Sequence, residues 1–147
     1  MGCGYSLWSP PETGVAVCSL ENRTKRAGVD LIFTQALREE LLARGFRLCP
    51  PQEACYLLRG EVRGLERSAI SFTRADYAQE YRLRARVDLW VTNPQGELIL
   101  HPQLEEEGEY LVVSDLATTE ENEEQALREL ARRVARQLCL ELRRFRR

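Results

Sequence analysis

The sequence contains very little histidine and lysine and has no long apolar run. His101 is the only histidine, and Lys25 is the only lysine among 21 Lys+Arg cations. A lone histidine without cysteine or acidic residues at ligand spacing is a poor metal site. No apolar run approaches the roughly 18 residues that a membrane-spanning helix needs. The chain also lacks a glycine-rich phosphate-binding loop after a strand.

These absences argue against enzymatic chemistry. Catalysis by a cysteine would require that cysteine to meet His101, and nothing in the sequence supports such a pair. We therefore predict a protein that is not an enzyme and that uses no metal and no cofactor. The net charge of −2 also excludes a surface that binds polyanions over its whole area. With 147 residues, 44% hydrophobic and 30% charged, the chain has the composition of one globular domain.

The charges are segregated along the chain. Residues 105–124 hold nine acids and no base, whereas residues 125–147 hold eight arginines and only Glu129 and Glu141 as acids. Acidic residues at the start of a helix and basic residues towards its end both stabilise the helix dipole. The alternative is that the basic helix binds nucleic acid or another anion, although the acidic stretch before it would repel such a ligand.

Hydrophobic periodicity predicts alternating helices and strands. The expected order begins with a strand over 15–20 and a helix over 30–44. A strand over 54–62 follows, with a kink at Gly60 or Gly64 and an extension towards Phe72. A long strand over 77–91, a turn at 93–96, an edge strand over 97–104 and 110–113, and a last helix capped by Thr118 or Thr119 complete the order. This order predicts an α+β fold, with a mixed sheet of about four strands and two helices packed on one face. Residues 1–13 are expected to form a leader, and residues 14–147 a single domain.

The cysteines differ in context. Cys18 and Cys139 lie on apolar elements and are expected to be buried thiols. Cys49 and Cys55 flank a Pro-Pro loop, where a small disulfide is reasonable in an oxidising compartment and two thiols in a reducing one. Cys3 has three interpretations: the lipid-bearing first residue of a mature lipoprotein, a palmitoylation site beside a myristoylated Gly2, or part of an untethered tail.

Several stretches in one order resemble the LptE family of lipopolysaccharide (LPS) assembly lipoproteins. The stretches that carry this resemblance are Cys3-Gly4-Tyr5, Leu58-Arg59-Gly60-Glu61-Val62, Glu80-Tyr81-Arg82-Leu83, Gly96-Glu97-Leu98-Ile99 and the helix over 126–135. The resemblance covers roughly residues 3–143. It favours the lipoprotein interpretation of Cys3 and implies that a signal segment is missing in front of it.

The resemblance also implies a function. Members of this family are anchored by lipid on the periplasmic side of the cell outer membrane. They form a complex with the β-barrel LptD, plug it, help it to assemble and bind LPS. The expected partners of this chain are therefore an LptD-type barrel, LPS and a membrane reached through lipid on Cys3, with no nucleic acid. A soluble module that binds anions or nucleic acid through its basic C-terminal helix is the alternative.

The expected contact residues are arginines. The resemblance implies that LPS-contacting basic residues lie in loops at one end of the sheet, where Arg74 and the nearby Arg67 fall. The polar face of the long strand carries Arg82, Arg84 and Arg86, which we expect to face the barrel or LPS, because a guanidinium donates paired hydrogen bonds to phosphate. Glu120 and Glu121 stand where the family pattern would place another basic residue, so a two-point basic clamp is not expected.

Overall fold

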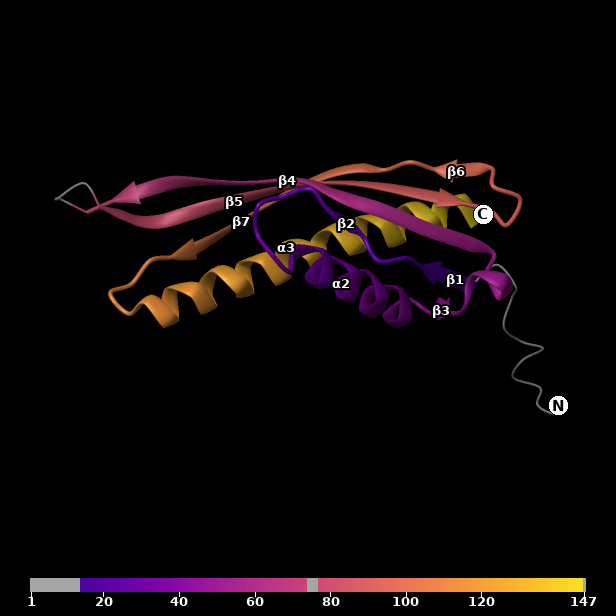
Figure 1. The fold of residues 1–147 in the computed structure, drawn as a ribbon, viewed down its shortest axis with the longest axis horizontal. Coiled ribbons are helices and arrows are strands. Elements are labelled where there is room, and N and C mark those ends of the chain that lie inside the picture. Colours follow the sequence, from indigo (N-terminus) through magenta and orange to yellow (C-terminus); the bar gives the residue numbers. More distant parts are fainter. Residues whose placement is uncertain (1–13, 74–76, 147) are drawn as a thin grey trace.

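The computed structural model describes residues 14–73 and 77–146, which form a mixed seven-stranded sheet with two long helices on one face (Figure 1). The elements are β1 (Gly14–Val17), β2 (Glu21–Asn22), α2 (Val29–Ala43), β3 (Arg47–Leu48), the 3₁₀ helix η2 (Pro51–Glu53), β4 (Tyr56–Phe72), β5 (Ala78–Thr92), β6 (Leu98–Leu100), β7 (Gln103–Leu111) and α3 (Leu116–Arg146). The predicted α+β class and the placement of both helices on one face are confirmed. The predicted number of about four strands is wrong.

The additional strands are short. β1 pairs in parallel with β3 on one side and with β4 on the other, and β2 pairs in parallel with β4 further along. The strand predicted over 15–20 is shorter, because β1 ends at Val17, and a second strand, β2, follows after residues 18–20. Strands of two to four residues are too short to display a period of two, so periodicity did not reveal them.

The centre of the sheet is the long antiparallel hairpin of β4 and β5. Their 17 and 15 residues agree with the strong alternation expected over 77–91 and with the extension towards Phe72. A register shift falls between Val62 and Gly64, so the irregularity expected at Gly60 or Gly64 lies at the second position. We call the end with the β4–β5 turn and the β7–α3 connection the tip, and the opposite end, where β1 begins and α3 ends, the base (Figure 1).

β6 and β7 form the edge of the sheet beside β5. They are interrupted at Pro102, which has no N–H to donate, while its carbonyl accepts a hydrogen bond of 2.9 Å from the Leu89 N–H. The edge strand that the sequence predicts over 97–104 is therefore confirmed, with a break at Pro102. Two outward carbonyls of β7 are capped by α3: Arg133 donates to Glu107 O at 2.6 Å and Asn122 donates to Leu111 O at 3.1 Å.

The two helices begin and end for different reasons. Gly28 and Gly45, with φ of 85° and 89°, bracket α2 close to the predicted limits of 30–44. α3 begins at Leu116, earlier than predicted, because Asp115 accepts hydrogen bonds from the Ala117 N–H and the Thr118 hydroxyl. The prediction that Thr118 or Thr119 caps α3 is therefore wrong.

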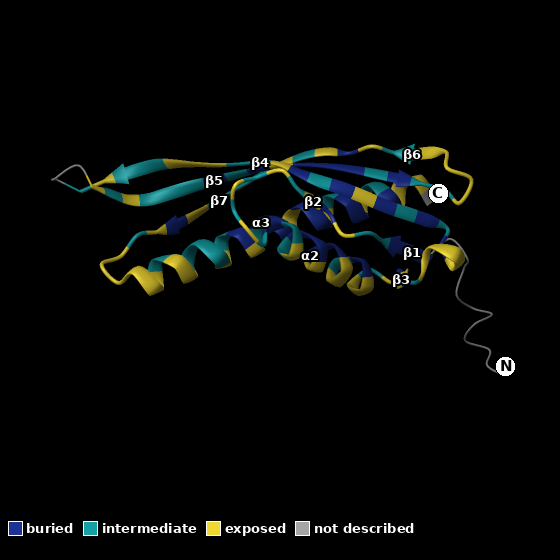
Figure 2. Ribbon diagram, in the orientation of Figure 1, coloured by how far each residue is buried: buried dark blue, intermediate teal, exposed yellow. Residues whose placement is uncertain are grey.

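The core lies between the sheet and both helices at the base half of the molecule. Buried residues gather where α2 and α3 lie side by side beneath β4 and β5, and become sparser towards the tip, which α2 does not reach (Figure 2). Phe33 of α2, Leu89 of β5 and Leu130 of α3 are each fully buried there. None of the described helices is both long and apolar enough to cross a membrane.

Candidate functional site

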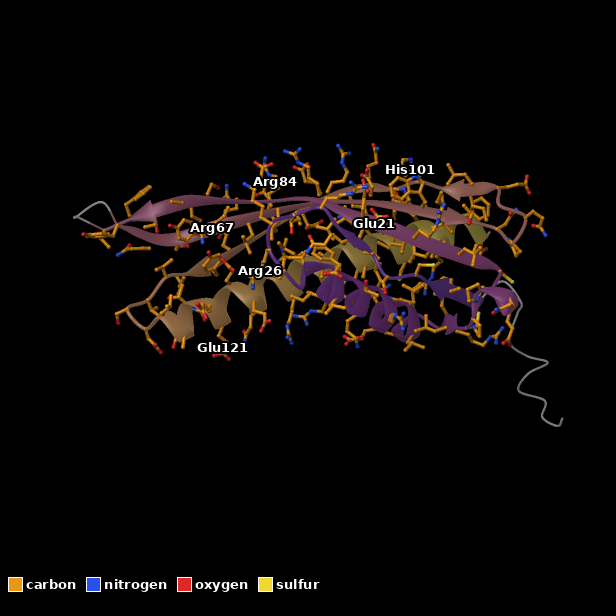
Figure 3. The ribbon with its side chains drawn as sticks, viewed as in Figure 1. Glu21, Arg26, Arg67, Arg84, His101 and Glu121 are labelled. Atoms are coloured by element: carbon orange, nitrogen blue, oxygen red, sulfur yellow. The ribbon has the colours of Figure 1, made fainter. Side chains whose placement is uncertain are left out.

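The sheet face turned away from the helices, which we call the open face, carries a row of arginines. Arg82, Arg84 and Arg86 alternate with the buried side chains of β5, and their side chains are between 40% and 48% exposed. Figure 3 shows Arg84 pointing away from α2 and α3. The polar face that the alternation predicted is therefore confirmed as an exposed surface.

These arginines are paired with glutamates on the neighbouring strands. The antiparallel register places Glu109, Glu107 and Glu105 of β7 opposite Arg82, Arg84 and Arg86. The shortest N–O distances are 2.9 Å for Arg82–Glu109, 2.9 Å for Arg84–Glu107 and 2.6 Å for Arg86–Glu66, and further pairs at 3.5–3.7 Å join the row into one network.

This network, which we call the ionic ladder, changes what the open face offers. The hydrogen bonds that Arg84 donates to the Glu107 carboxylate raise the pKa of Arg84, so this guanidinium stays charged. The charge of Arg84 is nevertheless balanced by the neighbouring glutamates. A phosphate that binds Arg84 would therefore have to compete with a carboxylate that is already in place. The ladder is therefore a polar, charge-balanced surface rather than a positive one. Glu105, Glu107 and Glu109, which were predicted to belong to an acidic stretch before a helix, are part of the ladder.

Arg67 lies on the other face of the sheet, in a cluster around Glu123 of α3. Tyr110 donates a hydrogen bond of 2.7 Å to Glu123, Arg26 forms an ion pair with it, and Arg67 approaches it at 3.7 Å. The Arg67 guanidinium also lies 4.6 Å from the centre of the Tyr81 ring, a cation–π geometry. We call this group the Glu123 cluster; it joins the β2–α2 loop, three strands and α3.

The Glu123 cluster should contribute measurably to stability. Replacing Glu123 with alanine is expected to lower the free energy of unfolding by about 1 kcal/mol, because two arginines and a tyrosine lose their shared acceptor. Chemical denaturation measures the change. Glu124→Ala is the matched control, since the Glu124 side chain is 47% exposed and, within the described part of the chain, forms an ion pair only with Arg128 on the same helix. Equal effects of the two substitutions would contradict the role given to the cluster.

A groove of about 640 Å³ runs from the Glu123 cluster towards the tip. Tyr81, Tyr110, Val112 and Leu116 supply its apolar lining. Its charged lining consists of Arg26, Arg67, Glu120, Glu121, Glu123 and Glu124. The structure therefore separates the arginines predicted as contact residues. Arg67 faces the helices, whereas Arg84 faces away from them (Figure 3). Arg82 and Arg86 lie on the same side of β5 as Arg84. Arg74 lies outside the described residues.

The remaining predicted residues fall as follows. Cys3 lies outside the described part of the chain. Cys49 and Cys55 are thiols in this structure, and their disulfide stays a prediction. Burial raises the pKa of the Cys49 thiol. Cys139 is a buried thiol, as predicted, and burial raises its pKa to about 12. The prediction that Cys18 is buried is wrong, because this side chain is only partly buried.

The lone histidine has an aromatic partner. His101 stacks on Trp90 with 4.7 Å between ring centres, at the base end of the open face. Across residues 14–73 and 77–146, no three His, Cys, Asp or Glu residues are placed to hold a metal ion.

The arginines of α3 are largely engaged by carboxylates. Arg128 pairs with Glu124, Arg132 and Arg133 pair with Glu129, and Arg136 approaches Glu40 of α2. Hydrogen bonding by Arg132 lowers the pKa of Glu129, which keeps this acid ionised beside them. A helix face whose charges are balanced in this way does not favour the nucleic-acid alternative.

Sequence comparison identifies one family. A family model described as "LptE: Lipopolysaccharide-assembly" matches residues 13–142. Among curated proteins, no sequence matches this chain.

Solved structures share the fold. A minor lipoprotein from Acinetobacter baumannii is 22% identical, with a TM-score of 0.64 over 89% of this chain and 90% of that chain. The rare lipoprotein B from Shewanella oneidensis is 20% identical, with a TM-score of 0.58 over 84% and 92%. A PelC dodecamer from Paraburkholderia phytofirmans has a TM-score of 0.52 at 20% identity over 84% and 86%. Because the fold occurs in more than one assembly, it does not specify a function by itself.

Proposed function

Because this chain belongs to the LptE family of lipopolysaccharide-assembly proteins, whose model matches residues 13–142, we propose that it is a non-enzymatic lipoprotein of the outer membrane. In this proposal it forms a complex with an LptD-type β-barrel, occupies the lumen as a plug and helps the barrel to assemble. It also binds LPS during transport to the cell surface. Lipid on Cys3 holds it on the periplasmic side.

The ionic ladder is the structural feature that best supports the plug. The lumen of a large outer-membrane barrel is polar, so a plug needs a surface that hydrogen-bonds without presenting apolar residues. The ladder offers guanidinium and carboxylate groups in alternation along β5 and β7. Because its charges are balanced, it suits a lumen lined with both donors and acceptors. We therefore propose that the open face contacts the barrel wall.

The proposed LPS contacts lie nearer the tip. Arg67 lines the groove beside the apolar parts of Tyr81, Tyr110, Val112 and Leu116, and the acids Glu120, Glu121, Glu123 and Glu124 line it too. An anionic group of LPS would bind Arg67 by displacing its carboxylate partner Glu123. Arg74 is proposed as a second contact from its position in the sequence between β4 and β5.

The segment that links the proposed lipid to the fold is short. Cys3 lies 11 residues before Gly14, and 11 residues span at most about 40 Å.

Co-purification tests the complex. The chain is expressed with a lipoprotein signal segment in front of Cys3 and a C-terminal tag, and the tag is used to purify it from outer-membrane extract. We expect a large β-barrel protein to be retained. Neutralising one rung of the ladder with Arg84→Gln and Glu107→Gln together is expected to lower the retained barrel about tenfold, which corresponds to about 1.4 kcal/mol.

The matched control neutralises an exposed pair elsewhere. Arg132→Gln with Glu129→Gln removes an ion pair of 2.7 Å from α3 and leaves the open face unchanged. It is expected to retain the barrel as the parent chain does. Absence of any barrel from the parent chain would contradict the proposed complex. Equal losses in both double variants would contradict the assignment of the open face.

A further inference from the structure

The arginines that lack a carboxylate partner are concentrated at the base. Most described arginines form at least one ion pair within 4 Å, including every one on the tip half of the sheet and on α3 up to Arg136. Among the described residues, no carboxylate pairs with Arg47, Arg59, Arg143 or Arg144. Lys25 and Arg38 share this property, and Arg38 donates to the Val17 carbonyl at the end of β1.

The base is also where the N-terminal segment reaches the fold. β1 begins there at Gly14, which pairs with Arg47 of β3. A Cβ built on Gly14 would lie 3.5 Å from the Arg47 guanidinium, so this arginine lies next to the start of β1. α3 ends at the same end of the molecule (Figure 1). Its last turns border a groove of about 460 Å³ with residues 100–102, in which Glu141 accompanies Arg144 and Phe145.

Exposed apolar side chains accompany these cations. Phe145 is 50% exposed, Leu140 is 47% exposed and Leu98, at the start of β6, is 57% exposed. Residues 143–147 have the sequence Arg-Arg-Phe-Arg-Arg. Aromatic residues flanked by unpaired cations are typical of surfaces that rest in the headgroup region of an anionic bilayer.

We propose that the base is a membrane-docking surface for anionic phospholipid headgroups, separate from the lipid on Cys3. Arg143 and Arg144 contact headgroup phosphates, and Phe145 enters the boundary between headgroups and acyl chains. The orientation relies on the proposed function, because lipid on Cys3 would bring the base towards the bilayer. The combination of apolar residues with unpaired arginines favours a lipid surface over nucleic acid, which would need the charge alone.

Vesicle co-sedimentation tests this surface without lipid on the protein. The folded chain carrying Cys3→Ser is mixed with vesicles of phosphatidylethanolamine and phosphatidylglycerol, and separately with phosphatidylcholine vesicles. We expect salt-sensitive binding to the anionic vesicles and little binding to the neutral ones. Arg143→Gln with Arg144→Gln is expected to lower the partition coefficient about 30-fold, because each arginine near an anionic surface contributes about fivefold.

The control removes the same net charge from another part of α3. Arg128→Gln with Arg132→Gln should change the partition coefficient less than twofold, and circular dichroism verifies that each variant is folded. Equal binding to neutral and anionic vesicles, or an unchanged partition coefficient for the Arg143 and Arg144 variant, would overturn the proposal. The assay contains no barrel and no LPS, so its failure is distinct from failure of the proposed function.

Discussion

Replacing Phe33 with alanine is expected to lower the free energy of unfolding by about 3–5 kcal/mol. Phe33 lies on α2, is fully buried and belongs to the core between the two helices and the sheet. The alanine variant loses the favourable free energy of transferring an aromatic ring from water into the core. It also contains a cavity that the surrounding side chains cannot close. Because small domains are stable by only about 5–15 kcal/mol, this one substitution removes a large share of the total.

Leu31→Ala is the matched control for Phe33. It lies two residues earlier on the same helix and is 66% exposed, so truncating it should change the free energy of unfolding by less than about 0.5 kcal/mol. Denaturant titration followed by far-ultraviolet circular dichroism measures both variants. If both lose a similar amount of stability, the core does not lie on the Phe33 side of α2.

Replacing Gly60 with valine is expected to cost at least about 3 kcal/mol, at the upper end of the range for overpacking a core. A Cβ at this position would lie 2.5 Å from Leu89 Cδ2 and 2.8 Å from the Asp88 carbonyl oxygen. The leucine side chain has little freedom, since it is fully buried, and the carbonyl belongs to the paired strand β5. The sheet would therefore have to separate locally between β4 and β5.

Gly64→Val on the same strand provides the comparison. No atom lies within 4 Å of a Cβ built on Gly64, so a β-branched residue fits there without displacing its neighbours. Its stability should equal or exceed that of the parent chain, because valine favours extended backbone more than glycine does. Thermal unfolding measures both variants. A loss at Gly64 as large as the loss at Gly60 would show that backbone freedom, and not crowding, is what glycine supplies in β4.

Elements with a long hydrophobic pattern could be predicted from the sequence, and elements of two residues could not. The 15 residues of β5 alternate so regularly that the sequence alone identified the strand and its polar face. The helix predicted over 30–44 also agrees closely with α2, which Gly28 and Gly45 bracket with positive φ. β2 and β3 have two residues each, and their existence depends on parallel partners brought together from elsewhere in the chain, which no local pattern contains.

The candidate site was less predictable because its partners are distant in sequence. The sequence showed that Arg84 is exposed but not that Glu107 lies opposite it, since the register of two strands is decided by their common core and not by the charges. Glu123 was similarly assigned to a run of acids near a helix start. Its contacts with Arg26 and Tyr110 depend on how α3 crosses the sheet.

The contacts that α3 makes with the outer edge of β7 protect the free protein from pairing with other chains. An uncovered edge strand offers backbone groups to other chains and invites aggregation. Here Arg133 and Asn122 of α3 already occupy the carbonyls of Glu107 and Leu111, and glutamates repeat along the strand. A second copy approaching this edge would meet occupied acceptors and like charge, so the fold discourages its own polymerisation while its open face stays accessible.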